Sequence, residues 1–215
     1  MKFRNRNQST FGTSCLREYA LLVRDIRPGD HVLDLGAHVG SFSVRAAELG
    51  ANVRSYEPDP DNYALLVENT VGLAVQANQL AVTADGRDVQ LYRTNTPLEV
   101  SANAGQSVLP GRRTHVSDTL RSVSFQSVLE AGPVDLLKVD VEGAELEYDW
   151  SLIPRSVRFL AVEFHACHCE RAYGNRDTLV SSVERLLATG FTCSKRLDPR
   201  NWDGWLQRSF VLRRL

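Results

Sequence analysis

The sequence predicts an α/β protein built on one seven-stranded, mostly parallel sheet with helices on both faces. Short apolar runs alternate with amphipathic stretches along all 215 residues, which is typical of strands connected by helices. No internal repeat or low-complexity block interrupts this alternation. The last two runs flank LDPRNWDGW, in which Pro199 and Asp203-Gly204 favour the turn of an antiparallel hairpin. We therefore expect the last strand to run antiparallel.

The individual elements follow from the spacing of apolar residues. The expected strands are His31–Leu35, Asn52–Glu57, Val75–Val82, Val134–Val141, Phe159–Phe164, Phe191–Arg196 and Leu206–Leu212. The expected helices are Ser41–Leu49, Asp59–Val71, Thr119–Ala131, Ala144–Trp150 and Asp177–Thr189. Ser41 and Asp59 are candidate N-terminal caps, and Gly50 and Gly190 are candidate stops. Asn95–Ser117 has no clear period, so we expect a functional loop there.

Composition limits the classes of function. The chain has 25 Lys and Arg against 26 Asp and Glu, so it lacks the overall positive charge that favours nucleic acid or anionic membranes. The start, MKFRNRNQSTF, is followed by no apolar core of a signal peptide, and no run is long enough to span a membrane. Four cysteines in a chain of this length do not indicate a secreted disulfide framework. A soluble cytoplasmic protein with reduced thiols is expected.

The stretch VLDLGAHVGSF combines a strand, a glycine turn and the start of a helix. Such a turn lies at the carboxyl edge of the sheet, where open α/β proteins bind ligands, and presents helix N–H groups. The dinucleotide fingerprint is absent, because His38 stands where a pyrophosphate needs a glycine. Asp34, two residues before Gly36, would repel a pyrophosphate and suits an ammonium group. NAD is therefore not the expected ligand.

A second acid indicates the rest of the ligand. Glu57 follows Gly36 by 21 residues, close to the roughly 20 at which an acid accepts hydrogen bonds from a ribose. An adenosine with an amino-acid tail satisfies both acids, and S-adenosylmethionine has that description. A tight connection without ligand is the alternative, and the position of Glu57 counts against it. The candidate cofactor-binding residues are Asp34, Gly36, Ala37, Gly40, Ser41, Glu57 and Pro58.

Ionisable residues also end the strand predicted at Val134–Val141. Lys138, Asp140 and Glu142 share one face of this strand by the period of two. A central parallel strand is covered on both faces, so these side chains are expected at its open carboxyl end. Glu145 adds a carboxylate just inside the following helix. The alternative is a purely structural ion network around Lys138.

Three blocks, VLDLGAHVGSFSVRAAELG, SYEPDPDNYALLVENT and DLLKVDVEGAELE, together resemble the FkbM family of S-adenosylmethionine-dependent methyltransferases. The distinguishing block is D-x-x-K-x-D-x-E-G-x-E. The resemblance runs from about Arg27 to His165 and implies a class I methyltransferase (Rossmann-like) fold. We expect one domain, 1–215, with 1–28 as an N-terminal helical extension or cap and 29–215 as the catalytic core. The residues that match family motifs are Asp34, Gly36, Gly40, Glu57, Asp140, Glu142 and Glu145.

The next strand ends with Glu163 and His165 on one face, beside the Asp140 strand. An imidazole of near-neutral pKa suits removal of a proton from a hydroxyl that attacks the sulfonium methyl group. The candidate catalytic residues are therefore Asp140, Glu142 and His165. As an alternative, these residues and Glu163 hold a divalent cation that acidifies the hydroxyl. This alternative stays open, and no metal is predicted.

Cys167-His168-Cys169 follows that strand and contains zinc-capable side chains. Together with His165 it offers four ligands within five residues, too close in sequence to surround one tetrahedral ion. We expect this segment, with Tyr173 and the loop Asn95–Ser117, to form a cap over the substrate rather than a zinc site.

The expected reaction is O-methylation of a small molecule, natural product or glycan, with S-adenosyl-L-homocysteine as the other product. One alternative is an N-methyltransferase acting on nucleic acid or another acceptor. The near-neutral charge and the absence of an Asn/Asp-Pro-Pro-aromatic motif after the Asp140 strand count against nucleic acid. The other alternative is a non-catalytic, cofactor-binding partner subunit, which would not need the acidic residues at two strand ends. A membrane partner is not expected, and the sequence does not indicate the oligomeric state.

Overall fold

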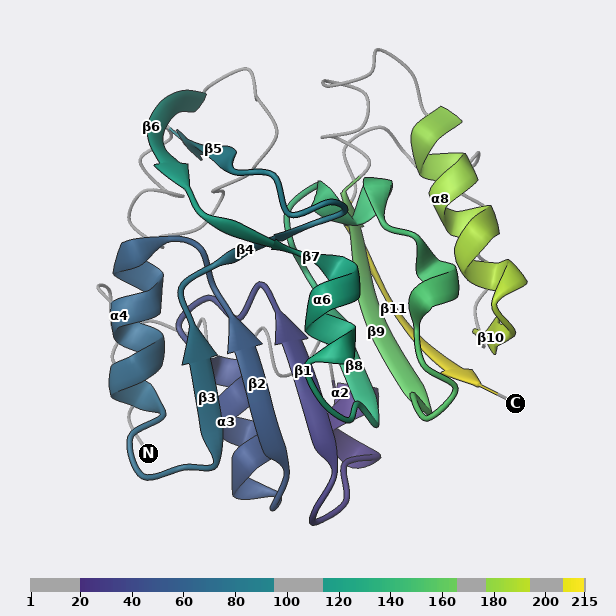
Figure 1. The fold of residues 1–215 in the computed structure, drawn as a ribbon. Helices are drawn as coiled ribbons and strands as arrows, with labels where there is room; N and C mark the ends of the chain where they lie inside the picture. The colour runs from purple at the N-terminus through teal and green to yellow at the C-terminus, as the bar shows by residue number, and fades with distance from the viewer. Residues whose placement is uncertain (1–19, 95–113, 166–176, 194–206, 215) are drawn as a thin grey trace.

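A computed structural model describes residues 20–94, 114–165, 177–193 and 207–214. The main strands are β1 His31–Leu35, β2 Asn52–Tyr56, β3 Val75–Asn78, β8 Leu136–Val139, β9 Phe159–His165, β10 Phe191–Thr192 and β11 Gln207–Arg214. They form one seven-stranded sheet in the order β10-β11-β9-β8-β1-β2-β3 (Figure 1). Neighbours from β3 to β9 are parallel, whereas β11 is antiparallel to β9 and to β10. The predicted fold class is confirmed, including the antiparallel last strand.

Helices cover both faces of this sheet. They are α2 Ala20–Arg24, α3 Ser41–Glu48, α4 Pro60–Asn69, α6 Phe125–Glu130 and α8 Asp177–Ala188, with 3₁₀ turns η1 Ala144–Glu147 and η2 Trp150–Leu152. In Figure 1, α2 and α3 lie behind the sheet and α6 lies in front of it. Two small sheets pair β4 Ala81–Thr83 with β7 Ser122–Ser124, and β5 Val89–Thr94 with β6 Thr114–Leu120. The β5–β6 pair lies at the end of the sheet to which the arrowheads of β1 to β3 point (Figure 1).

A side chain caps the N-terminus of α4, whereas no side chain caps that of α3. The Asp59 side chain accepts the N–H groups of Asp61 and Asn62 at the start of α4, so the predicted cap is confirmed. The predicted Ser41 cap is wrong. The N-cap of α3 is Gly40, in the left-handed region at φ 87°, and no side chain caps this helix. The chain needs a left-handed residue to enter α3 directly from the turn, which favours glycine.

Three predicted elements are subdivided. The strand expected at Val75–Val82 divides into β3 and β4, because β4 leaves the main sheet to pair with β7. The helix expected at Thr119–Ala131 is strand first, and α6 begins only after Ser124, whose hydroxyl accepts the N–H of Ser127 at 3.1 Å. The helix expected at Ala144–Trp150 is the pair η1 and η2. In the first two cases pairing or capping outweighs a short apolar pattern.

The core lies on both faces of the sheet because side chains alternate along each strand. On β1, Leu33 and Leu35 pack in the cluster that includes α6 and α8, whereas Val32 packs in the cluster that includes α2 and α3. Alternation places Asp34 on the same face as Val32. Asp34 therefore lies between the sheet and α3, where a buried carboxylate needs polar partners.

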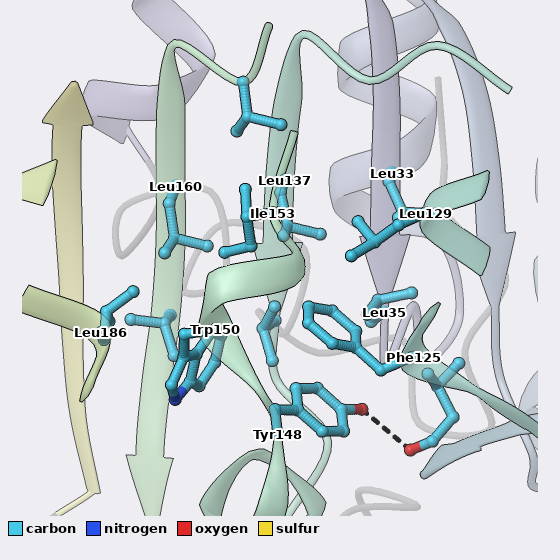
Figure 2. Packing of buried hydrophobic residues seen from close by; sticks show 14 of the residues in the cluster. Leu33, Leu35, Phe125, Leu129, Leu137, Tyr148, Trp150, Ile153, Leu160 and Leu186 are labelled. Carbon is cyan, nitrogen blue, oxygen red and sulfur yellow. Dashed lines mark hydrogen bonds between the residues drawn. The ribbon is translucent and has the colours of Figure 1, made fainter. Parts of the chain in front are cut away.

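An aromatic cluster fixes the segment that follows β8 (Figure 2). The ring of Tyr148 stacks on Phe125 with centroids 4.2 Å apart, and its hydroxyl donates to the Val82 carbonyl at 2.8 Å. Trp150 is fully buried, and its indole N–H donates to the Ser182 hydroxyl at 2.9 Å. Such ring pairs add about 0.5–1.5 kcal/mol each beyond their buried area. The cluster thus anchors η1 and η2 against the sheet.

Some predictions concern residues that the structure does not describe. The central part of the loop expected at Asn95–Ser117, the segment Cys167-His168-Cys169, Tyr173 and most of the N-terminal extension lie outside the described ranges. Cys193, which is described, carries a free thiol. In the described part of the chain, every helix is too short or too polar to cross a membrane.

Candidate functional site

The glycine turn lies against the carboxyl end of β8. Gly36 has φ 77°, and a Cβ on this residue would overlap the Asp140 carbonyl oxygen. Gly40 has φ 87°, and a Cβ there would come within 2.7 Å of Leu66. Both positions favour glycine for backbone conformation, and Gly36 also requires it because it lies directly against backbone. The contact between Gly36 and Asp140 brings the turn beside the end of the neighbouring strand.

Several N–H groups of this turn are engaged within the protein. The N–H groups of Gly36 and Ala37 donate to the Tyr56 carbonyl at 2.9 and 3.0 Å. The His38 N–H donates to a carboxylate oxygen of Glu57 at 2.8 Å. These three groups fasten the turn to the end of β2. The strand–turn–helix pattern predicted open N–H donors at this turn, but these three N–H groups already donate within the protein.

Asp34 is buried beside Lys138 and α3. Its side chain is fully buried and accepts the hydroxyl of Ser43 from α3, and Lys138 Nζ lies 3.1 Å from its other oxygen. Sheet register explains this arrangement, because Asp34 lies beside Lys138 on β8 and beside Ser55 on β2. Lys138 also donates to the Gly36 carbonyl at 2.8 Å. In this structure Asp34 therefore holds the turn through Lys138, and its contact with an ammonium group of the cofactor stays a prediction.

Glu57 lies at the end of β2, where the sequence predicts a ribose acceptor. Burial raises its pKa to about 7, although hydrogen bonds from the backbone N–H groups of Asp59 and His38 act to lower it. A carboxylate offers about four acceptor positions. The Asp59, His38 and Asn62 donors occupy three of them, so acceptor capacity remains for a ribose hydroxyl. Pro58 is half-buried next to it. The role of Glu57 as a ribose acceptor stays a prediction.

The second group of side chains gathers at the carboxyl ends of β8 and β9. We call Asp140, Glu142, Glu163 and His165 the β8–β9 cluster. His165 Nε2 lies 3.2 Å from a carboxylate oxygen of Glu142 and 3.8 Å from one of Asp140. Lys138 links this cluster to the turn, since its Nζ lies 3.7 Å from Asp140. The structure therefore brings all three predicted catalytic residues together.

Glu145 orients His165. One oxygen of this fully buried carboxylate accepts the His165 backbone N–H at 2.9 Å and lies 3.1 Å from His165 Nδ1. The other oxygen accepts the Gly143 N–H at 2.7 Å. Sequence reasoning assigned Glu145 to the start of a helix. Its spacing in the family block was the available signal, but only the tertiary structure shows its contact with His165.

Burial and nearby charges shift the pKa values of His165 and Glu145 in opposite directions. Burial by itself would lower the pKa of His165, but the nearby charges of Glu142, Glu145 and Glu163 raise it well above 6.5. Burial would raise the pKa of Glu145, whereas the charge and hydrogen bonds of His165 lower it below its ordinary value. The acidic neighbours of His165 therefore shift its pKa upward from the near-neutral value expected from sequence. Carboxylates lie at both ring nitrogens of His165, with Glu142 at Nε2 and Glu145 at Nδ1.

Comparison with known proteins shows similarity to methyltransferases. The family model described as "Methyltransferase FkbM domain" matches residues 34–166, which include the turn, Glu57 and the β8–β9 cluster. Hexuronic acid methyltransferase AglP of Haloferax volcanii is 29% identical over 154 residues, covering 68% of this chain and 60% of that protein. A tRNA (guanine(37)-N(1))-methyltransferase of Aedes aegypti is 35% identical over 71 residues, covering 33% of this chain and 13% of that protein.

A solved structure shows the likeness of fold. The Methanococcus jannaschii fibrillarin pre-rRNA processing protein has a TM-score of 0.50 and 15% sequence identity, covering 87% of this chain and 67% of that chain. At this identity the comparison concerns the fold alone.

Proposed function

This chain belongs to the FkbM methyltransferase family, and from that premise we propose that it methylates a hydroxyl group of a glycan, with an acidic sugar as acceptor. The enzyme class, an S-adenosylmethionine-dependent methyltransferase, follows from the family. The acceptor is the proposed part. The AglP relative is described as a hexuronic acid methyltransferase, and this chain spans about 60% of its length.

The observation that carries the proposal is the β8–β9 cluster beside the glycine turn. A neutral hydroxyl is a weak nucleophile and becomes effective when a positioned group removes its proton. Such groups are present here, because carboxylate oxygens of Asp140 and Glu142 lie 3.8 and 3.2 Å from His165 Nε2. A subunit that only bound the cofactor would have no use for this arrangement.

The residues present fit the cofactor. Gly36 and Gly40 shape the turn, and Glu57 retains acceptor capacity for a ribose hydroxyl. When bound, S-adenosylmethionine supplies a methyl group on a positively charged sulfur, which leaves as the neutral thioether. The protein's own task is to hold the acceptor oxygen in line with that methyl group and to take the hydroxyl proton. Alignment supplies much of the acceleration in such a reaction.

The test is transfer of labelled methyl groups from S-adenosylmethionine to three acceptors: an oligosaccharide ending in a hexuronic acid, the same oligosaccharide ending in a neutral hexose, and tRNA. We expect label on the hexuronic acid oligosaccharide. Glu142→Gln should lower this rate by about 10²- to 10⁴-fold, the usual contribution of proton transfer. Glu48→Gln is the matched control, because Glu48 pairs with Arg45 on the exposed side of α3.

Other outcomes would contradict the proposal. Label on tRNA would favour the nucleic-acid alternative, which the short match to the tRNA methyltransferase supports. Binding of S-adenosylmethionine without transfer to any acceptor would favour the non-catalytic alternative. Full activity of Glu142→Gln would show that Glu142 is not the group that takes the hydroxyl proton.

A further inference from the structure

We infer that Asp140, Glu163 and His165 bind a divalent metal ion, and that this ion holds the hydroxyl and the carboxylate of an acidic sugar beside the cofactor. The choice of sugar rests on the proposed function. The ion site rests only on these three side chains and on Glu145, which orients His165. They come from the ends of two neighbouring strands, β8 and β9.

The three ligand atoms are already close to the spacing that an ion requires. One nitrogen or oxygen of each side chain lies within 4.8 Å of the others. If three atoms lie no more than 4.8 Å apart, an ion can occupy a point within about 2.8 Å of each of them. The nitrogen and oxygen ligands of Zn²⁺ and Mg²⁺ lie about 2.0–2.2 Å from the ion. Each atom must therefore move inward by at most about 0.8 Å. Adjustments of side-chain torsions provide a movement of this size without a change in the strands.

Glu145 supplies an independent observation in favour of the site. It holds His165 by both the backbone N–H and Nδ1, at 2.9 and 3.1 Å. Nε2 consequently faces the carboxylates of the cluster. A histidine that binds a metal characteristically has its other ring nitrogen held by a carboxylate or carbonyl, which fixes the ring orientation. The full burial of Glu145 keeps this positioning residue in place.

The charges around the site also favour a cation. Asp140 and Glu142 lie 3.8 and 3.2 Å from His165 Nε2, and Glu163 offers an oxygen within 4.8 Å of the ligand atoms of Asp140 and His165. Lys138 lies nearer Asp34, at 3.1 Å, than Asp140, at 3.7 Å. An acidic sugar would meet repulsion from these carboxylates. A divalent ion removes this conflict, because it binds protein and sugar carboxylates together. Two carboxylates and one imidazole are ligands suited to manganese and other divalent ions.

The ion would assist the reaction in a defined way. A hydroxyl bound to a divalent ion loses its proton more readily, and Glu142, 3.2 Å from Nε2, is placed to accept that proton. The oxygen then forms a bond to the methyl carbon, and the electron pair of the breaking carbon–sulfur bond stays on sulfur. No oxidant or reductant is required. Glu163 would thereby contribute to catalysis as an ion ligand.

The test uses Mn²⁺ alone and needs no acceptor. Titration of the full-length protein, followed by electron paramagnetic resonance of free Mn²⁺, should show one site per chain. Glu163→Gln and Asp140→Asn should each weaken this site at least 10-fold, whereas Glu48→Gln should leave it unchanged. Binding of S-adenosylmethionine by calorimetry serves as the folding check for each variant.

Two results would overturn the inference: no stoichiometric Mn²⁺ binding by the parent protein, or equal binding by the parent and both cluster variants. Either result leaves the glycan proposal standing, because transfer to the hexuronic acid oligosaccharide is measured separately. Conversely, Mn²⁺ binding lost in both variants, together with methylation of tRNA and not of the glycan, would retain the ion site and refute the glycan acceptor.

Discussion

Replacement of Glu57 by glutamine is expected to remove a pH-dependent loss of stability. Glu57 is 6% exposed, and its pKa is raised from 4.5 to about 7. The folded protein therefore binds this proton more tightly than the unfolded chain does. Stability from this group is fully present below about pH 4.5 and is lost as the pH rises through 7. At 1.36 kcal/mol per pKa unit, the loss is about 3 kcal/mol in total and about 2.5 kcal/mol between pH 5 and 8.5.

The assay is urea unfolding of the ligand-free protein at pH 5, 7 and 8.5. Between the lowest and the highest pH, the parent should lose about 2.5 kcal/mol of unfolding free energy relative to Glu57→Gln. Glu48→Gln, which alters an exposed carboxylate, should follow the parent. A difference between the parent and Glu57→Gln that stays constant across these pH values would refute the reasoning, because only a titrating group produces a slope.

The same substitution connects stability with binding. If Glu57 accepts a ribose hydroxyl, Glu57→Gln should weaken S-adenosylmethionine binding by about 1–3 kcal/mol, the usual cost of losing a charge-assisted hydrogen bond. Calorimetry at pH 8 measures this directly. A variant that is more stable at high pH and yet binds the cofactor less well would show that the buried carboxylate is retained for binding. Unchanged affinity would place the ribose elsewhere.

Two further predictions concern the turn and its support. Asp34→Ala leaves Lys138 buried without its nearest carboxylate, so the unfolding free energy in urea should fall by about 3–5 kcal/mol; a fall below about 1 kcal/mol would show that this pair does not hold the turn. Gly36→Ala should lower the melting temperature far more than Gly72→Ala. Both glycines have similar positive φ values, 77° and 79°, but only Gly36 lies against backbone, so equal losses would contradict the close approach.

Local patterns in the sequence were sufficient for most of the framework. The apolar run at His31–Leu35, the glycine turn and the cap at Asp59 are decided by neighbours within a few residues. Steric limits on φ, the alternation of side chains along strands and capping hydrogen bonds act over such short separations. The same patterns failed where short segments had a choice of partner. At Val75–Val82, for example, pairing of β4 with β7 ended the strand early.

The candidate site shows a similar division. Sequence spacing placed Asp140, Glu142 and His165 at the ends of two adjacent strands, and the structure brings them together. Sequence spacing could not pair Asp34 with Lys138, because that contact depends on the register between β1 and β8. A residue's face can be predicted from alternation, but its partner across the sheet requires the strand order.

The sequence by itself determined the fold class, the family and the chemical types of the residues at the strand ends. Only the tertiary structure decided what those residues do to one another. Glu145 holds His165, and three carboxylates raise the pKa of that imidazole, although they come from separate segments of the chain. The physical reason is that hydrogen bonds and Coulomb interactions depend on distance and burial in space, which the order of residues along the chain does not specify.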